Sequence, residues 1–147
     1  MNFKIRQCEI SDTKAIYDLN VCEMGYDYKE EKTKEKLKEL LESDKDKILV
    51  ALIDNIIVGY VHANNHDVIY APHMKNIMGI AVSSNVKKQG IGRALLKAIE
   101  EWAQESGACG IRIVSGATRT GAHEFYRLSW SRGIVTPVSK VIKQLAF

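Results

Sequence analysis

A glycine-containing turn that leads into an amphipathic helix is the feature that most constrains how this 147-residue chain can fold. The turn covers residues 86–92 and follows an apolar run that ends at Val82. Gly107 stands where a left-handed residue commonly ends a helix. The pattern predicts a helix from Gly90 or Ile91 to just before Gly107. Apolar side chains recur along it with the spacing of one buried face: Ile91, Ala94, Leu95, Ala98, Ile99, Trp102 and Ala103.

The composition of this turn predicts an anion site. The first N–H groups of a helix have no partner within it, and the positive end of the helix dipole points the same way. Glycine allows a ligand to approach the main chain closely, while Lys87, Lys88 and Arg93 add positive charge. We therefore expect a phosphate or diphosphate to bind here.

Two familiar phosphate-binding patterns do not fit the turn. A nucleoside-triphosphate loop has four residues between its glycines and then Lys-Ser/Thr, whereas one residue separates Gly90 from Gly92 and Arg93-Ala94 follows. A dinucleotide fingerprint has Gly or Ala three residues after its second glycine, where this chain has Leu95. On these residues alone, a turn that binds no ligand stays open.

The turn also resembles part of a known family. The pattern Lys87-x-x-Gly90-x-Gly92 is similar to the Arg/Gln-x-x-Gly-x-Gly/Ala signature of the GNAT superfamily, the acetyl-CoA-dependent N-acetyltransferases. The spacing to a later Ala-x-x-Phe-Tyr helix also suits that family. Four more segments resemble family elements in order: the opening strand and turn (Ile5-Arg6 with Asp12), the third strand (57–60), the central strand (76–82) and the Ala-x-x-Phe-Tyr helix (122–126).

The resemblance implies one N-acetyltransferase domain over residues 1–147 with an α/β fold. Its sheet would be mixed, mostly antiparallel and six- to seven-stranded, with about four flanking helices. A loop is expected at 66–75, around Pro72, and a hairpin turn at Asp54-Asn55. Ser11 or Asp12 can cap a first helix with the apolar face Ala15, Ile16, Leu19 and Cys22. We expect strands at 3–6, 48–53, 56–63, 77–82 and 111–114, one or two more in 134–145, and further helices at 30–43 and 119–128.

The family chemistry implies a catalytic site. Backbone N–H groups around Ile80, Ala81 and Val82 would polarise the acetyl carbonyl. Tyr126 would give a proton to the departing thiolate, since a phenol has a pKa of about 10 and a thiol about 8.5; an interior aromatic paired with Phe125 is the other interpretation. Contacts with coenzyme A are implied for Ile80, Ala81, Val82, Lys87, Lys88, Gln89, Gly90, Ile91, Gly92, Arg93, Ala94, Arg119 and Phe125.

The proton acceptor is not assigned by the sequence. Many family members carry an acid on the central strand, but Gly79 occupies that position here. A water chain that ends at His73, Glu23 or a tyrosine could serve, and so could capture of the neutral amine. The acceptor wall is expected at Tyr26, Tyr28 and His73. The chain also departs from the family at Lys87 (usually Arg or Gln), at Arg119 (often Asn) and at Ser129-Trp130 (usually Gly-Phe).

Charge is distributed unevenly along the chain. Residues 1–86 hold 11 basic and 14 acidic side chains, whereas 87–147 hold 10 and 4. The net charge of +3 does not indicate nucleic acid, and an acidic acceptor half would suit a cationic amine. No apolar run reaches the length of a membrane span, and no signal peptide is expected. Three widely spaced cysteines and four histidines show no metal-ligand pattern, so we expect free thiols, no metal and a cytoplasmic protein.

The predicted function is transfer of an acetyl group from acetyl-CoA to a primary amine by direct attack in a ternary complex. The amine could belong to an aminoglycoside, a polyamine, an arylalkylamine or a protein. The partners expected are acetyl-CoA and this amine, with neither nucleic acid nor membrane, and a homodimer is compatible. Two alternatives stay open: a non-catalytic acyl-CoA-binding or regulatory module with the same fold, and a nucleotide-binding domain that uses Gly90 and Gly92.

Overall fold

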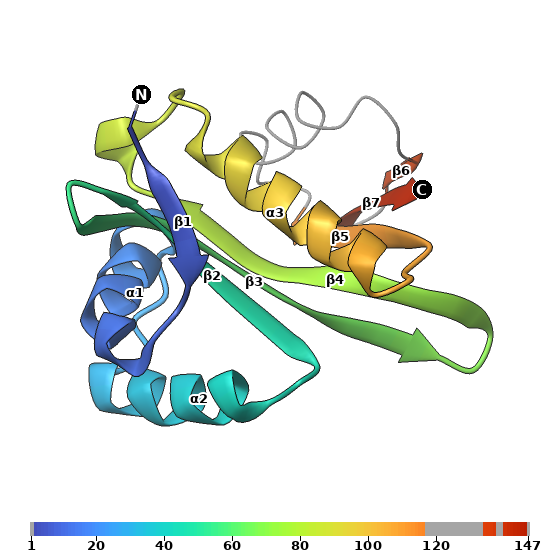
Figure 1. Cartoon of the computed structure of the whole chain (residues 1–147), viewed down its shortest axis with the longest axis horizontal. Helices are drawn as coiled ribbons and strands as arrows, with labels where there is room; N and C mark the ends of the chain where they lie inside the picture. Colours follow the sequence, from blue (N-terminus) through green and yellow to red (C-terminus); the bar gives the residue numbers. More distant parts are fainter. Residues whose placement is uncertain (1, 117–133, 138–139, 147) are drawn as a thin grey trace. The chain divides into compact units, whose positions relative to one another are not determined.

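The computed structural model describes residues 2–116, 134–137 and 140–146. Neighbouring strands are hydrogen-bonded in the order β1-β2-β3-β4-β5-β7-β6 (Figure 1). The strands are β1 (Lys4–Gln7), β2 (Asp46–Ile53), β3 (Ile56–Val68), β4 (Ala71–Val82), β5 (Gly110–Gly116), β6 (Ile134–Pro137) and β7 (Lys140–Ala146).

The registers confirm the expected mixed, mostly antiparallel sheet. Strands β1 and β2 pair antiparallel with Lys4 opposite Leu52, and β5 and β7 pair antiparallel with Ile111 opposite Leu145. Strands β6 and β7 are also antiparallel, so two closing strands are present in the region where one or two were expected. Strands β4 and β5 are parallel, with Lys75 opposite Ile111.

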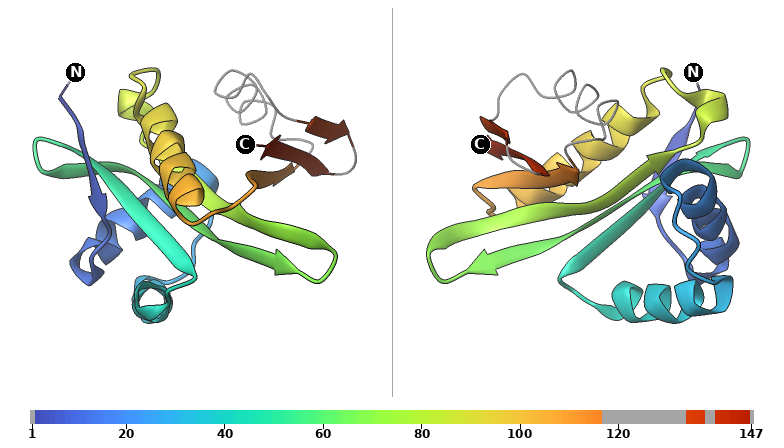
Figure 2. Two further views of the ribbon diagram at one scale, coloured as in Figure 1. Left: turned by 45° about the vertical axis from the view of Figure 1, so that its right-hand side comes forward. Right: turned by 180° about the vertical axis from the view of Figure 1, so that it is seen from behind.

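The chain divides into two compact units, one of residues 1–63 with 79–99 and one of residues 64–78 with 100–147. In the first unit, helices α1 (Thr13–Leu19) and α2 (Glu30–Glu42) cover one side of the strands, and the first turns of α3 (Ile91–Glu105) cover the other (Figure 2). The cluster on the α1 side joins helix and strand residues: Cys8, Ile16, Leu19, Leu37, Ile48, Val50, Tyr60 and Ala81.

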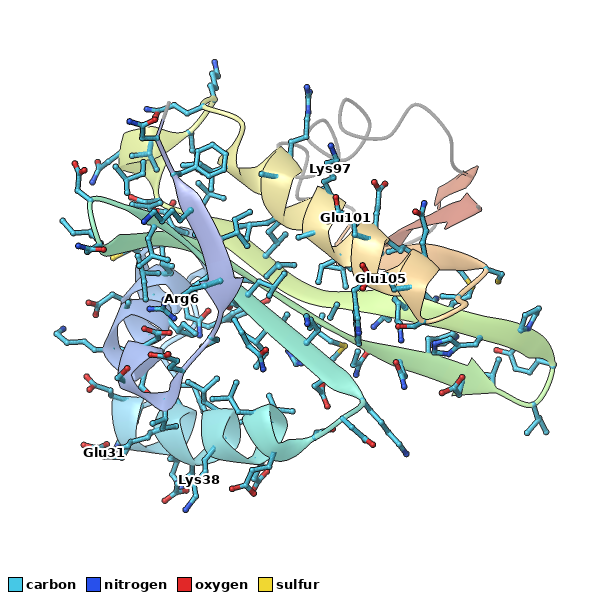
Figure 3. The ribbon with its side chains drawn as sticks, viewed as in Figure 1. Arg6, Glu31, Lys38, Lys97, Glu101 and Glu105 are labelled. Atoms are coloured by element: carbon cyan, nitrogen blue, oxygen red, sulfur yellow. The ribbon has the colours of Figure 1, made fainter. Side chains whose placement is uncertain are left out.

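Helix α3 has the predicted limits. It begins at Ile91, and Gly107 follows its end with a φ of +74°. Ile91, Leu95 and Ile99 are fully buried, as the spacing of apolar residues requires. Lys97, Glu101 and Glu105 lie along the outer side of the helix (Figure 3). Within the described residues, no helix is both long and apolar enough to span a bilayer. The helix predicted at 119–128 falls outside the described residues.

The hairpin turn between β2 and β3 is confirmed. Asp54 and Asn55 have φ values of +50° and +65°, the left-handed pair that a two-residue turn with a right-handed strand twist requires. Further along β3, a Cβ on Gly59 would lie 3.0 Å from the carbonyl oxygen of Ala81. The glycine therefore allows the end of β4 to approach β3 closely.

The loop predicted at 66–75 is wrong. Strand β3 continues to Val68 and β4 begins at Ala71, so only Ile69 and Tyr70 connect them. Figure 1 shows the resulting long hairpin in green. Pro72 lies next to the first residue of β4, close to the strand start where proline is commonly found. The polar residues at 64–67 obscured the strand alternation in the sequence.

The predicted first helix is also shorter than its apolar face suggested. Helix α1 ends at Leu19, and a π-helical turn, η2, covers Asn20–Met24. Cys22 is therefore exposed and does not continue the buried face. Nor does Asp12 cap α1 through its side chain. Its carboxylate instead accepts the backbone N–H of Glu9 at 2.8 Å and closes the preceding turn, η1 (Ile10–Asp12).

Candidate functional site

The turn between β4 and α3 is anchored where it begins. The N–H of Ser83 donates to the carbonyl oxygen of Val58 on β3 at 2.7 Å. A short 3-10 turn, η3 (Ser84–Val86), follows, in which the N–H of Val86 donates back to Ser83 at 3.1 Å. The first half of the turn therefore continues the pairing of the strands, and its position is set by the sheet.

The second half of the turn reverses the chain immediately before the helix. Lys88 and Gly90 have φ values of +67° and +84°. A left-handed lysine is strained by about 1 kcal/mol, which marks this position as one that the surrounding structure imposes. The carbonyl of Gly90 accepts the N–H of Ala94 at 3.0 Å, and this is the first hydrogen bond of α3.

This geometry leaves donors free for an anion. The N–H groups of residues 91–93 precede the first helical hydrogen bond and have no acceptor within α3. Nothing among the described residues lies within 4 Å of a Cβ built on Gly90, so the main chain there is open to a ligand. Lys87, Lys88, Gln89 and Arg93 are exposed around it, whereas Ile91 and Gly92 are buried. The arrangement can hold a phosphate through main-chain N–H groups and cationic side chains.

A carboxylate from a distant part of the chain contacts the same turn. Glu23, in the π-helical turn η2, accepts the N–H of Ser84 at 3.0 Å with Oε2. Its Oε1 lies 3.6 Å from Lys87 Nζ, and its side chain is only 13% exposed. Glu23 had been a candidate proton acceptor by sequence, but both of its oxygens are engaged with the turn.

The two ends of the strand that leads to the turn have different neighbours. Lys75 lies over the ring of Trp102 of α3, with Nζ 3.9 Å from the ring centre. A Cβ on Gly79 would instead lie 3.8 Å from Tyr60 Oη, and Ala81 belongs to the same buried cluster as Tyr60. Lys75 and Trp102 belong to the second unit, whereas Gly79, Ala81 and Tyr60 belong to the first. Each end of β4 therefore packs against residues of its own unit.

A buried phenol occupies the space beside Gly79. Tyr60 Oη donates to Asn20 Oδ1 and lies 3.7 Å from Met24 Sδ. Burial, with a smaller effect of Tyr26, raises the pKa of Tyr60 to about 12. The phenol is therefore neutral at physiological pH and acts as a hydrogen-bond donor to Asn20. Sequence patterns did not identify Tyr60 or Asn20 as site residues, because the contact between them depends on the π-helical turn.

The other predicted site residues are placed as follows. Tyr26 and Tyr28 follow η2 and are 57% and 51% exposed. The N–H of Tyr26 donates to the carbonyl of Asn20 at 2.9 Å. His73 belongs to the second unit, where its Nδ1 lies 2.7 Å from Asp67 Oδ1. Arg119, Phe125 and Tyr126 fall outside the described residues, so their predicted roles stay predictions.

Comparisons with protein families and with solved structures both find similar proteins. Residues 13–130 match the acetyltransferase (GNAT) family. No curated protein sequence matches the chain at a significant level. Among solved structures, a GNAT-family acetyltransferase from Streptococcus pneumoniae is 18% identical, with a TM-score of 0.77 and coverage of 99% of this chain and 100% of that one.

Several similar structures contain a coenzyme, including these two. The PaiA N-acetyltransferase of Thermoplasma acidophilum, in complex with coenzyme A, is 20% identical, has a TM-score of 0.79, and both chains are covered completely. A putative streptothricin acetyltransferase from Bacillus anthracis, in complex with acetyl coenzyme A, is 16% identical, has a TM-score of 0.77, and covers 100% of this chain and 99% of its own. At these identities the likeness establishes a common fold.

Proposed function

Because the chain belongs to the GNAT acetyltransferase family, we propose that it transfers an acetyl group from acetyl-CoA to a primary amine, with residues 1–147 acting as one catalytic domain. The observation that carries the proposal is the turn at the start of α3. Its left-handed residues Lys88 and Gly90, its open main chain and its exposed basic side chains match what a diphosphate requires. The coenzyme complexes of two relatives with this fold support the same choice of ligand.

In the proposed reaction the amine nitrogen attacks the thioester carbonyl carbon, and the C–S bond then breaks. The developing oxyanion needs fixed donors, for which we propose the main-chain N–H groups of residues 80–82. Their place at the end of β4, directly before the turn proposed to bind the diphosphate, supports the assignment. The thiolate takes a proton from Tyr126, and the amine nitrogen loses one to solvent or to a neighbouring group.

Coenzyme binding can be tested separately from chemistry. We expect CoA and acetyl-CoA to raise the melting temperature, since a ligand that binds only the native state stabilises it, while ATP and NAD leave it unchanged. Gly90→Val should weaken CoA binding measured by calorimetry. Gly107→Val is the matched control, because Gly107 has a similar φ of +74° and equally open surroundings at the other end of α3. Equal CoA affinity in both variants and the wild type would refute the proposal.

Activity is tested with a panel of amines: an aminoglycoside, a polyamine, an arylalkylamine and a peptide with a free amino terminus. Release of the coenzyme thiol reports transfer. Tyr126→Phe should bind acetyl-CoA as the wild type does but turn over more slowly. Binding without turnover of any amine would favour the alternative, a non-catalytic acyl-CoA-binding or regulatory module. This alternative needs a test because Gly79 has no side chain at the position where many family members carry an acid.

A further inference from the structure

We propose that Glu23 is a positioning residue that holds the turn between β4 and α3 (residues 83–90, here called the coenzyme turn) in its binding conformation and directs Lys87 toward the coenzyme phosphates. This inference rests on the proposed function, because the turn must bind a coenzyme for its position to matter. It assigns to Glu23 a role different from that of a proton acceptor.

The first argument is the engagement of the carboxylate. Glu23 is the acceptor for the N–H of Ser84, at 3.0 Å, and the partner of Lys87, at 3.6 Å. Its side chain is largely removed from solvent, whereas that of Lys87 is 58% exposed. A shielded carboxylate that accepts a backbone N–H makes a stronger hydrogen bond than a neutral acceptor would. The contact therefore fixes the main chain at Ser84 as well as one side chain.

The second argument is that Glu23 is itself held in place. Its turn, η2, is tied to β3 through Asn20, which accepts the Tyr60 hydroxyl, and through Met24, which lies beside that hydroxyl. Gly25 ends the turn in a left-handed conformation with a φ of +74°. Such π-helical turns are rare and frequently occur at functional sites. A carboxylate on this anchored turn gives the coenzyme turn a fixed reference point.

The consequence is preorganisation of the coenzyme turn. Val58 and Glu23 hold its beginning, and the first hydrogen bond of α3 holds its end at Gly90. The intervening N–H groups are then placed before a ligand arrives, which lowers the ordering cost of binding. The ammonium of Lys87 has three donors, so an ion pair with one carboxylate oxygen leaves donors for phosphate.

The test removes the contact from each side. Glu23→Ala deletes the acceptor, and Ser84→Pro deletes the donor while Glu23 stays intact. Proline suits the first position of a 3-10 turn, and Ser83 already has angles near polyproline II (φ −55°, ψ 134°), a conformation that a following proline favours. We expect both variants to raise the Kd for CoA by about tenfold, a typical magnitude for coupling between linked groups. Ser84→Pro also keeps the test decisive if Glu23→Ala fails to fold.

Two further variants identify the mechanism. Glu23→Gln retains an oxygen for Ser84 and should stay within about threefold of the wild type, as a positioning role predicts. Glu23→Ala combined with Lys87→Ala should raise the Kd by less than the product of the two single effects, because Glu23 acts partly through Lys87. Glu31→Ala is the matched control, since Glu31 lies on the outer side of α2 (Figure 3) and is exposed.

Kinetics separate positioning from proton transfer. A positioning residue predicts a raised KM for acetyl-CoA that exceeds any fall in kcat, with rescue by Glu23→Gln. If Glu23 were the proton acceptor, kcat would fall by more than KM rises, and Glu23→Gln would be as impaired as Glu23→Ala. If the wild type binds CoA and both Glu23→Ala and Ser84→Pro bind it equally tightly, the inference about Glu23 fails while the proposed function stands. If the wild type does not bind CoA, the proposed function fails with it.

Discussion

The ammonium of Lys75 lies 3.9 Å from the centre of the Trp102 ring and donates a hydrogen bond to Asn65 Oδ1 at 2.6 Å. Burial lowers the pKa of Lys75 from its ordinary 10.5. The native state therefore binds this proton less tightly than the unfolded chain does, and the stability linked to Lys75 is complete above pH 10.5 and declines as the pH falls through the lowered pKa. We expect the melting temperature of the wild type minus that of Lys75→Met to increase between pH 8 and pH 10. A difference that stays constant over this range would contradict the effect.

The ion pair of Arg6 and Asp12 also makes stability depend on pH, but here the group that titrates is a carboxylate. Burial disfavours the Asp12 carboxylate, but hydrogen bonds from Arg6 and the Glu9 N–H outweigh it and hold its pKa below the ordinary 3.8. The linked stability is present above pH 3.8 and is lost as the pH falls through the lowered pKa. We expect Asp12→Asn to cost about 2 kcal/mol at pH 7 in urea unfolding, and the gap to narrow as the pH falls below 3.8. A pH-independent gap would rule out the linkage.

Gly59 and Gly79 offer a matched pair of substitutions on neighbouring strands. A Cβ on Gly59 would lie 3.0 Å from the Ala81 carbonyl oxygen, whereas the nearest atoms to a Cβ on Gly79 are 3.8 and 3.9 Å away. We expect Gly59→Ala to destabilise the protein by about 1–3 kcal/mol, because a backbone atom cannot move aside cheaply. Gly79→Ala should be neutral. Denaturant unfolding of both variants measures the contrast, and equal costs would show that β4 shifts freely away from β3.

Glu105 places a negative charge at the carboxyl end of α3, where the helix dipole is also negative. The last turn of α3 has no basic residue. Glu105→Lys should therefore stabilise the protein by about 0.3–1 kcal/mol, seen as a higher melting temperature at low salt. The gain should shrink in 1 M salt, which screens exposed charges. A salt-independent gain would point to packing instead.

Local sequence signals predicted some elements well. The limits of α3 followed from the period of Ile91 to Ala103 and from Gly107, and the tight turn followed from Asp54-Asn55. These features depend on residues close together in the chain. The extension of β3 and β4 was missed because half-exposed polar residues at 64–67 conceal the alternation, and Pro72 was weighted as a strand breaker.

Features of the site that depend on long-range contact were not predictable. The segment at 86–92 could be identified from its glycines and bases, but the hydrogen bond that anchors the turn just before it joins Ser84 to Glu23, which are 61 positions apart. The π-helical turn has no distinctive sequence pattern, since Asn20–Met24 continues the expected helical period. The proximity of Tyr60 to Gly79 likewise follows from pairing of β3 with β4. The coenzyme contacts proposed for Arg119, Phe125 and Tyr126 stay predictions.

The contact between Glu23 and Ser84 has a consequence for how the two segments can vary. The acceptor is a side chain, whereas the donor is a main-chain N–H. Every residue type except proline can supply that donor at position 84. Sequence drift at position 84 therefore leaves the contact in place, while drift at position 23 to a side chain without an acceptor removes it.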